Sequence, residues 1–201
     1  MVGGDDYQAK YRQLREIIDP WAKLGSRQYL NGTLRIGHVP HIAPEGYLHR
    51  LLPPITKCDM EDLQDAIGIE FPVSLSNLLF LHNGLSLFDL HVTIEGRRTS
   101  YRRSDMDAMM EQPYDMVLPN TIERPDSAPD ELIFIGSLGD ERQPVVMWPD
   151  GSISLWDTGT DGATASIYAD VFDLLVKEAH KAQLLFDSKG RRFDDASRLP
   201  N

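Results

Sequence analysis

The sequence predicts an α+β protein, with a mixed or antiparallel central sheet packed by N-terminal helices and a C-terminal helix. Apolar residues recur at helical spacing near both ends of the chain, whereas the middle holds short segments with strand-like alternation, separated by turn residues. An α/β protein would instead alternate strands with helices along its length. The clustering of strands in the middle therefore favours the α+β class.

The composition indicates one globular domain. The chain has 201 residues, of which 41% are hydrophobic and 25% charged, and this balance is ordinary for a folded protein with one core. We expect one domain over residues 1–186, including an N-terminal helical elaboration, and a polar, flexible tail over residues 187–201. No apolar run approaches the roughly 18–20 residues that cross a bilayer.

Two features of the sequence predict a cytoplasmic location. The N-terminal stretch MVGGDDYQAK has neither the basic start nor the apolar block of a secretory signal. Cys58 is the one cysteine, which excludes an internal disulfide and a cysteine-based metal cage. Both features fit a reducing compartment.

The first half of the chain contains most of the expected helices. An amphipathic helix over residues 5–24 is kinked or ended by Pro20, and short strands follow around residues 34–36 and 47–51. In the next helix, residues 58–68, we expect Asp59 to cap the first turn and Gly68 to end it. A further short helix follows Phe71-Pro72, and its apolar face carries Leu75, Leu78, Leu79 and His82. Asn83-Gly84 then supplies a left-handed exit.

The second half contains most of the expected strands. Residues 85–96 alternate as one strand, and residues 97–131 are expected to form a mobile, polar excursion with a weak helical patch at 105–111. A strand at 132–136 precedes a hairpin whose strands, 145–148 and 152–156, flank a turn at Pro149-Asp150-Gly151. We expect the last helix to run from a cap at Ser166 to about Lys181, packed on these strands.

This order of signals resembles the SUKH superfamily, which includes fungal cell-wall synthesis regulators and bacterial immunity proteins. The resemblance covers residues 58–182, although residues 97–131 match less well, and HVPHIAPEGYLHR belongs to a longer lead-in than the family has. It is carried by Leu63, Ile67, Gly68, Pro72, Leu75, Leu78, Leu79, Asn83, Gly84, the hairpin VVMWPDGSISLW, Val171, Phe172, Leu174 and Leu175. It implies a SUKH-like fold, no catalytic apparatus or cofactor, and binding to other proteins, in bacteria commonly to toxins that are often nucleases.

The net charge indicates the kind of partner. A formal charge of -11 repels phosphate backbones, so we expect no nucleic-acid partner, and it attracts basic proteins instead. Nuclease toxins tend to be basic because they bind phosphate, so a cationic toxin domain is the partner that the charge favours. The alternative is that the acidic composition only serves solubility.

The acidic loops beside the hairpin are the predicted interface. They bring carboxylates close to Trp148 and Trp156, either of which is a candidate aromatic anchor. The alternative is a solvated rim over a core tryptophan. The predicted partner-binding residues are Asp140, Glu141, Asp150, Trp156, Asp157 and Asp161.

Three other patterns in the sequence have residue types that could indicate a different function. His38, His41, Glu45 and His49 have the residue types of a zinc hydrolase, but Pro40 and Pro44 prevent a ligand-bearing helix, so we expect no metal. His82 is expected to bond or neutralise the carbonyls at its helix end and to take no part in catalysis.

The third pattern is the arginine-rich GRRTSYRRSD, which is either a phosphate or RNA patch or a set of intramolecular partners for carboxylates.

The sequence as a whole thus favours a non-enzymatic immunity protein. A regulatory or scaffold protein of the same fold is the alternative, and a metal-dependent hydrolase the third candidate.

Overall fold

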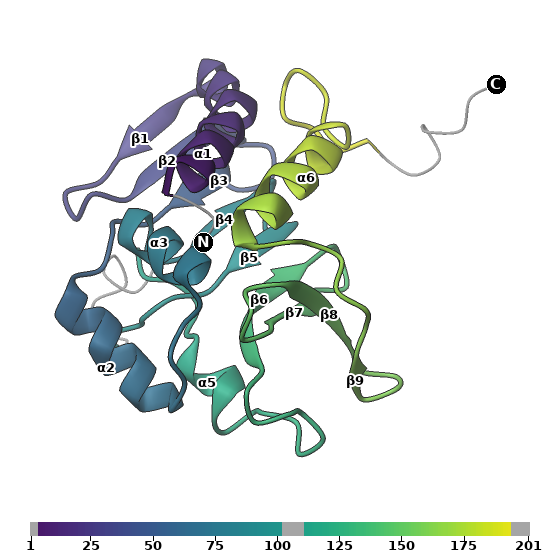
Figure 1. The fold of residues 1–201 in the computed structure, drawn as a ribbon. Coiled ribbons are helices and arrows are strands. Elements are labelled where there is room, and N and C mark those ends of the chain that lie inside the picture. The colour runs from purple at the N-terminus through teal and green to yellow at the C-terminus, as the bar shows by residue number, and fades with distance from the viewer. Residues whose placement is uncertain (1–3, 102–110, 194–201) are drawn as a thin grey trace.

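A computed structural model describes the backbone of residues 4–101 and 111–193, and Figure 1 shows how their elements are arranged. The helices are α1 (Gly4–Ile18), α2 (Lys57–Ile67), α3 (Val73–Leu81), α5 (Val117–Asn120) and α6 (Val171–Gln183), with a 3-10 helix η1 (Asp19–Leu24) after α1. The strands are β1 (Ser26–Gln28), β2 (Leu34–His38), β3 (Tyr47–Leu51), β4 (Leu85–Leu87), β5 (Val92–Ile94), β6 (Ile133–Leu138), β7 (Gln143–Met147), β8 (Ile153–Asp157) and β9 (Gly162–Ala163).

The strands of the described residues form one antiparallel sheet in which each strand pairs with the next along the chain. This order is a meander without crossovers, in which α2 and α3 lie between β3 and β4 and the excursion with α5 lies between β5 and β6. The α+β class predicted from the sequence is therefore confirmed, with an entirely antiparallel sheet.

The main core lies between the sheet and the pair α1 and α6, which lie side by side across one face (Figure 1). Tyr7 of α1 stacks on Phe172 of α6 with 5.3 Å between ring centroids, and Lys10 bonds Asp170 at the start of α6 across 2.6 Å. Inward-facing strand residues such as Ile36, Val92 and Ile133 complete this core. We call this side the helical face of the sheet and the opposite side its outer face.

A second, smaller core lies on the outer face of the C-terminal strands. Successive strand residues point to opposite faces, so Ile133 joins the main core whereas Leu132 and Phe134 join the second cluster. That cluster also contains Val146 and Trp156 and is closed by Ala128 from the loop after α5. The excursion after β5 thus covers part of the outer face.

Several local predictions are confirmed. The α-helix α1 ends at Ile18 and Pro20 lies in the first turn of η1, and strands occupy the two predicted positions around residues 34–36 and 47–51. Gly68 ends α2 in the left-handed conformation with φ 81°. The hairpin β7–β8 turns at Pro149-Asp150-Gly151. The buried face of α6 shares the main core with Ile133 of β6 and Ile153 of β8, and α6 also contacts β5.

Helix starts were predicted wrongly in two places. The N-cap of α2 is Thr56 and not Asp59, since Thr56 Oγ1 accepts from the Asp59 N–H at 3.1 Å while Asp59 Oδ2 accepts from Thr56 N–H at 3.2 Å. This is a reciprocal capping box. The N-cap of α6 is Asp170 and not Ser166, because Asp170 Oδ1 accepts from the Asp173 N–H at 2.8 Å.

The strand predicted over residues 85–96 is two strands. A turn at Phe88, Asp89 and Leu90, all with positive φ (50°, 53° and 70°), separates β4 from β5. The turn contains no glycine, so the alternation of side chains over residues 85–96 gives no sign that the strand is interrupted. The short strand β1 was not anticipated, and residues 187–192 form a hydrogen-bonded turn where a flexible tail was expected. The helical patch predicted at 105–111 lies, except for Glu111, outside the described residues.

Candidate functional site

The predicted acidic interface is divided between the two ends of the sheet. In an antiparallel meander, alternate turns lie at the same end of the sheet. The β6–β7 turn with Asp140 and Glu141 and the β8–β9 turn with Asp157 and Asp161 therefore share one end, whereas Asp150 in the β7–β8 turn lies at the other. The structure brings together four of the five predicted carboxylates.

Two of these carboxylates are already engaged within the chain. Asp140 pairs with Arg192 at 2.6 Å and faces His91 at 3.8 Å, so the pKa of Asp140 is lowered chiefly by its hydrogen bond to Arg192. Asp157 accepts from the Gly159 N–H at 2.8 Å and from Thr160 Oγ1 at 2.9 Å, which holds the β8–β9 turn and lowers the pKa of Asp157. At the opposite end, Asp150 accepts from the Ser152 N–H in the same way.

The two candidate anchors are not exposed rings. Trp156 is only 2% exposed and packs on Phe134 with 5.5 Å between ring centroids. Trp148 is half-buried, and its indole N–H donates to Ser154 Oγ at 2.9 Å. Trp156 is therefore a core tryptophan, as in the alternative interpretation of a solvated rim over a buried ring.

A cavity of about 400 Å³ opens on the outer face at the acidic end of the sheet. This volume is in the range of small-ligand sites. Phe134, Ser137 and Trp156 line it from the strands, Glu95 and Arg142 from the adjoining segments, and Asp161 from the β8–β9 turn. The remaining lining residues are Pro119, Glu123, Pro125, Gly136, Pro144 and Thr158.

A β-bulge in β6 builds the cavity wall. The pairing of β6 with β7 shifts register between Phe134 and Gly136, and this shift puts Phe134 and Ser137 on the same face although they are three residues apart. Gly136 has φ 157°, and a Cβ there would collide with the carbonyl oxygen of Thr93 on β5. Glycine is therefore required where the backbones of β5 and β6 approach.

Glu95 is the most perturbed carboxyl group of this cavity. Burial, followed by the negative charges of Asp115 and Glu123, raises the pKa of Glu95 to about 7, and Arg142 opposes this effect. Its Oε2 atom is inaccessible to solvent and has no hydrogen-bond partner in the part of the chain that the structure describes. Near neutral pH, Glu95 therefore changes its charge with small changes in proton concentration.

Ser137 is a second polar group without an internal partner. Its side chain is buried, with 7% exposure, lines the cavity, and its hydroxyl makes no hydrogen bond to any described residue. Leaving a buried hydroxyl unpaired costs on the order of 1–3 kcal/mol. Such a group is more easily explained beside a bound ligand than in a closed core.

A second cavity, of about 530 Å³, adjoins the first and shares Glu95, Pro119 and Glu123 with it. Tyr114 forms part of its wall, and two guanidinium groups lie over its ring, with Arg142 at 5.3 Å and Arg50 at 5.8 Å from the ring centroid. The Tyr101 hydroxyl donates to Asp115 Oδ2 in this wall, and burial raises the pKa of Tyr101 to about 12. The two cavities together form a groove that begins on the outer face of β6 and continues past Glu95 to Tyr101 and Tyr114.

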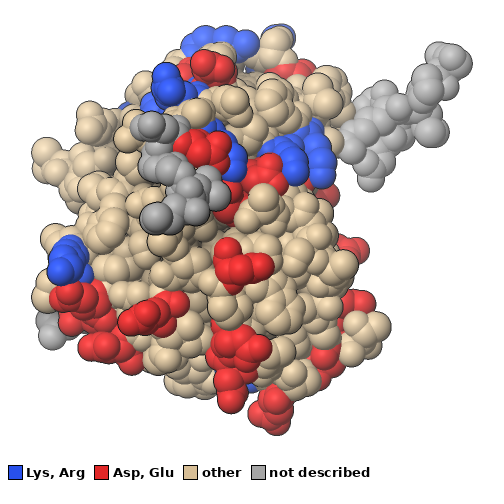
Figure 2. Space-filling model, viewed as in Figure 1, with Lys and Arg blue, Asp and Glu red and all other residues tan. Residues whose placement is uncertain are grey.

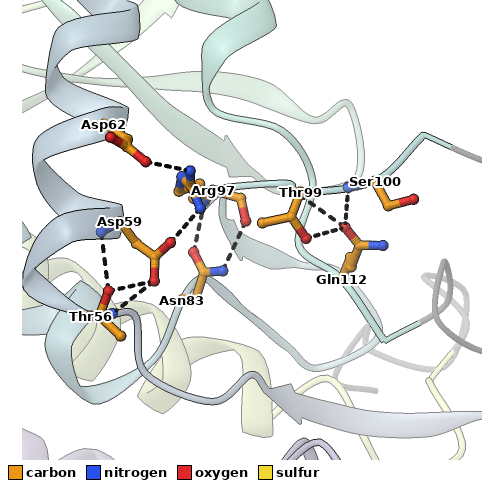
Figure 3. A network of polar contacts seen from close by, with 8 residues as sticks. All are labelled: Thr56, Asp59, Asp62, Asn83, Arg97, Thr99, Ser100 and Gln112. Carbon is orange, nitrogen blue, oxygen red and sulfur yellow. Dashed lines mark hydrogen bonds and ion pairs between the residues drawn. The ribbon is translucent and has the colours of Figure 1, made fainter.

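A hydrogen-bond network anchors the segment that forms this groove (Figure 3). Asn83, two residues after the end of α3, bonds both backbone groups of Arg97, and the Arg97 guanidinium bonds Asp59 and Asp62 of α2. Thr99 is joined to the returning segment of the excursion because Gln112 Oε1 accepts from its N–H at 3.0 Å. Arg97 is thus an intramolecular partner for carboxylates, one of the two roles expected for GRRTSYRRSD.

His82 has a structural role, but not the one predicted. The backbone N–H of His82 caps α3 by donating to Leu78 O, whereas its imidazole lies between Leu52 O, 2.9 Å from Nδ1, and the Tyr11 hydroxyl, 2.6 Å from Nε2. A neutral ring with the proton on Nδ1 satisfies both contacts. Burial lowers the pKa of His82, which also favours the neutral ring. The imidazole therefore joins α1 to the segment before α2 and does not neutralise carbonyls of its own helix.

The histidine series is spread over separate environments. His38 bonds Pro44 O at 3.0 Å, Glu45 pairs with Arg27 at 3.0 Å, and His41 is exposed. His49 is fully buried against Phe88, and burial lowers the pKa of His49 to about 3. Among residues 4–101 and 111–193, no group of three or more His, Cys, Asp or Glu side chains is arranged to hold a metal ion.

The charges on the helical side are unevenly distributed. Figure 2 shows Lys and Arg mainly in the upper part of this view, over α1 and α6, and Asp and Glu mainly in the lower part, around α2 and the C-terminal hairpins. Exposed carboxylates in and after α2 are Glu61, Asp62, Asp65 and Glu70. This α2 surface is a second acidic region that the sequence did not single out.

Comparisons with known proteins leave the family open. No protein-family model matches the chain, and no curated protein sequence is significantly similar to it. Within the described ranges, no helix is both long and apolar enough to cross a membrane.

Sequence reasoning missed Glu95, Ser137 and Arg142. Their grouping depends on a β-bulge and on an excursion that returns over the sheet, and neither has a local sequence signal. One local signal could have pointed to Glu95. It directly follows Val92–Ile94, three β-branched residues of a buried strand, where a carboxylate is unusual.

Proposed function

We propose that this chain is a non-enzymatic protein-binding domain of the SUKH type, and that it acts as an immunity protein by neutralising a basic toxin domain. The supporting observation is that Glu95, Glu123 and Asp161 line one cavity of the outer face, while Glu141, Asp157 and Asp161 lie in or beside the turns at one end of the sheet. We call these five carboxylates the acidic end. The net charge of -11 supports the same partner class.

The acidic end has more carboxylates than internal cations to pair with them. Glu123, Glu141 and Asp161 make no ion pair with any described residue. Less exposed carboxylates elsewhere do have such partners, for example Glu111 with Arg35 and Asp170 with Lys10. Unpaired carboxylates on the rim of a cavity give electrostatic complementarity to a cationic surface and accelerate its approach.

The cavity also contains one group that an acid–base enzyme would use, because the pKa of Glu95 is about 7. The other parts of a hydrolytic site are not assembled there. Ser137 and Thr158 are the hydroxyl-bearing residues that line the cavity, and no histidine is among the lining residues to activate either of them. Protein binding therefore explains the carboxylates of the acidic end without the further catalytic groups that a hydrolytic site would need.

The experiment is a kinetic binding measurement with catalytically inactive, basic nuclease toxin domains, each encoded beside this chain in a candidate genome. The association rate constant is measured at about 50 mM and about 300 mM salt, and we expect it to fall by at least tenfold at the higher salt. The double charge reversal Glu123→Lys plus Glu141→Lys removes most of this salt dependence and slows association.

The matched control is the reversal of two carboxylates on the α2 surface, Asp65→Lys plus Glu70→Lys, which changes the net charge equally. We expect a much smaller effect from it. Equal slowing by both double variants would mean that only net charge matters and would contradict an interface at the acidic end. Absence of binding by every basic domain would contradict the proposed function.

A further inference from the structure

The outer-face cavity lined by Glu95 has the chemistry of a receptor for a cation. Three carboxylates line it, Glu95, Glu123 and Asp161, against one guanidinium, that of Arg142. Arg142 stacks on Tyr114 and forms no ion pair with a described carboxylate. The cavity is therefore lined by more carboxylates than cations, and Arg142 offsets only part of the negative charge.

The neutral lining suits the same class of ligand. Phe134 and Trp156 provide aromatic surface, and planar guanidinium groups stack on such surfaces. Within this chain, the Arg124 guanidinium already lies over Phe134 at 5.8 Å from the ring centroid. The buried Ser137 hydroxyl, which has no partner among the described residues, is available to accept a hydrogen bond from an entering N–H group.

We propose that this cavity binds one guanidinium group, and that in the proposed function this group is an arginine side chain of the cationic partner. The identification of the ligand as an arginine of the partner rests on the proposed function, whereas binding of a guanidinium group to the cavity does not. Glu95 is the central ion-pair acceptor, Glu123 and Asp161 lie at the rim, and Ser137 accepts a hydrogen bond.

Arginine fits the cavity better than lysine for a geometric reason. The three carboxylates that line the cavity belong to three separate segments, which are the end of β5, the loop after α5 and the β8–β9 turn. A planar fork of five N–H donors can bond several such acceptors at once, whereas an ammonium group presents a compact point charge. A guanidinium probe should therefore bind more tightly than an ammonium probe of similar length.

Binding should be linked to the protonation of Glu95, because only the carboxylate forms an ion pair. The charged and titratable groups around Glu95 are Asp115 and Glu123, Arg142 from the β6–β7 turn, and Arg98, Tyr101 and Tyr114 from the adjoining cavity. Arg142 favours the ionised form, while both acidic neighbours oppose it. With a pKa of about 7, Glu95 is mostly ionised at pH 8 and mostly protonated at pH 6. The affinity for a cation should thus be roughly tenfold weaker at pH 6 than at pH 8.

The test uses small probes and the isolated chain. N-acetyl-arginine amide is titrated into the ¹⁵N-labelled protein at pH 8, with N-acetyl-lysine amide for the comparison of cations and N-acetyl-citrulline amide as the neutral probe of nearly the same shape. We expect saturable shifts of the Gly136, Ser137 and Thr158 amide signals by the arginine probe, with a dissociation constant on the order of 1 mM. We expect at least tenfold weaker binding of the citrulline probe.

Two variants separate a specific site from a general effect of charge. Glu95→Gln keeps the size of the side chain and should reduce the affinity for the arginine probe at least tenfold and abolish its pH dependence. Glu70→Gln removes an exposed carboxylate after α2 and should change neither. The dispersion of the spectrum before titration shows that each variant is folded.

Equal binding of the arginine and citrulline probes would overturn the proposal, and so would unchanged affinity in Glu95→Gln or the absence of saturable binding. These results do not depend on any protein partner. Failure of every toxin domain to bind, together with specific binding of the arginine probe, would contradict the proposed function and leave the guanidinium site supported.

Discussion

The Asn83 side chain holds both backbone groups of Arg97. Its Oδ1 accepts from the Arg97 N–H at 2.7 Å, and its Nδ2 donates to the Arg97 carbonyl oxygen at 2.9 Å (Figure 3). Gly96 makes room for this clamp, since a Cβ at that position would overlap Asn83 Oδ1. The clamp fixes the start of the excursion whose later residues form the outer-face cavity.

Replacement of Asn83 by Ala should lower the free energy of unfolding by about 2–3 kcal/mol, because two backbone groups lose their partner. Asn83→Asp should cost less, since the carboxylate still accepts from the Arg97 N–H and loses only the bond to its carbonyl. Urea unfolding followed by circular dichroism measures both changes. Equal stability of Asn83→Ala and the wild-type protein would show that the clamp contributes nothing to the fold.

Glu95→Gln should stabilise the protein at alkaline pH. The pKa of Glu95 is about 7 in the folded chain against an ordinary 4.5, so between these values the folded protein retains a proton that the unfolded chain has lost. The free energy of unfolding of the wild-type protein therefore falls as pH rises through this window. The variant avoids this loss, which is on the order of 2–3 kcal/mol at pH 8, and behaves like the wild type near pH 4.5.

Urea unfolding of both proteins between pH 4.5 and pH 8.5 measures this difference, with Glu70→Gln as the exposed control. The curves of the wild type and the control should run parallel. A difference between Glu95→Gln and the wild type that does not change with pH would refute the burial of an ionisable Glu95.

His49→Gln should weaken the pH dependence of stability on the acid side. The pKa of His49 is about 3 in the folded protein against an ordinary 6.5, because its ring is buried. Between these values the unfolded chain binds a proton that the folded protein does not, so stability falls as pH drops from 6.5, by up to about 1.4 kcal/mol per pH unit.

The variant should lose this contribution and be less stable than the wild type near pH 7, since Phe88 packs on the ring and its N–H bonds His49 Nδ1. Replacement of the exposed His41 by Gln serves as the control. Identical slopes between pH 4 and pH 6 in His49→Gln and in the wild type would contradict a neutral, buried His49.

The elements with local signals could be predicted from the sequence. The hairpin β7–β8 was predicted because alternating strands flank Pro149-Asp150-Gly151, and the end of α2 because Gly68 readily adopts a positive φ. The turn at residues 88–90 was missed because its left-handed residues are not glycines. Local signals therefore identified the strands of this chain better than the turn inside residues 85–96.

The candidate site could be predicted only in part. Asp157 and Asp161 were expected near the hairpin because both belong to its immediate continuation, and the structure places them at one end of the sheet. Glu95 and Ser137 come together with them only through the pairing of β5 with β6 and a register shift in β6. Such long-range pairing has no signature in a single sequence.

The pKa of the Glu95 carboxyl group, with and without a guanidinium ligand, tests the proposed cation receptor most directly. ¹³C-detected NMR titration of the side-chain carboxyl gives this value in the free protein and at saturation with N-acetyl-arginine amide. We predict a pKa of about 7 in the free protein and a value lower by about one unit or more in the bound protein, because a bound cation favours the carboxylate. An unchanged pKa at saturation, or an ordinary value near 4.5 in the free protein, would contradict the account.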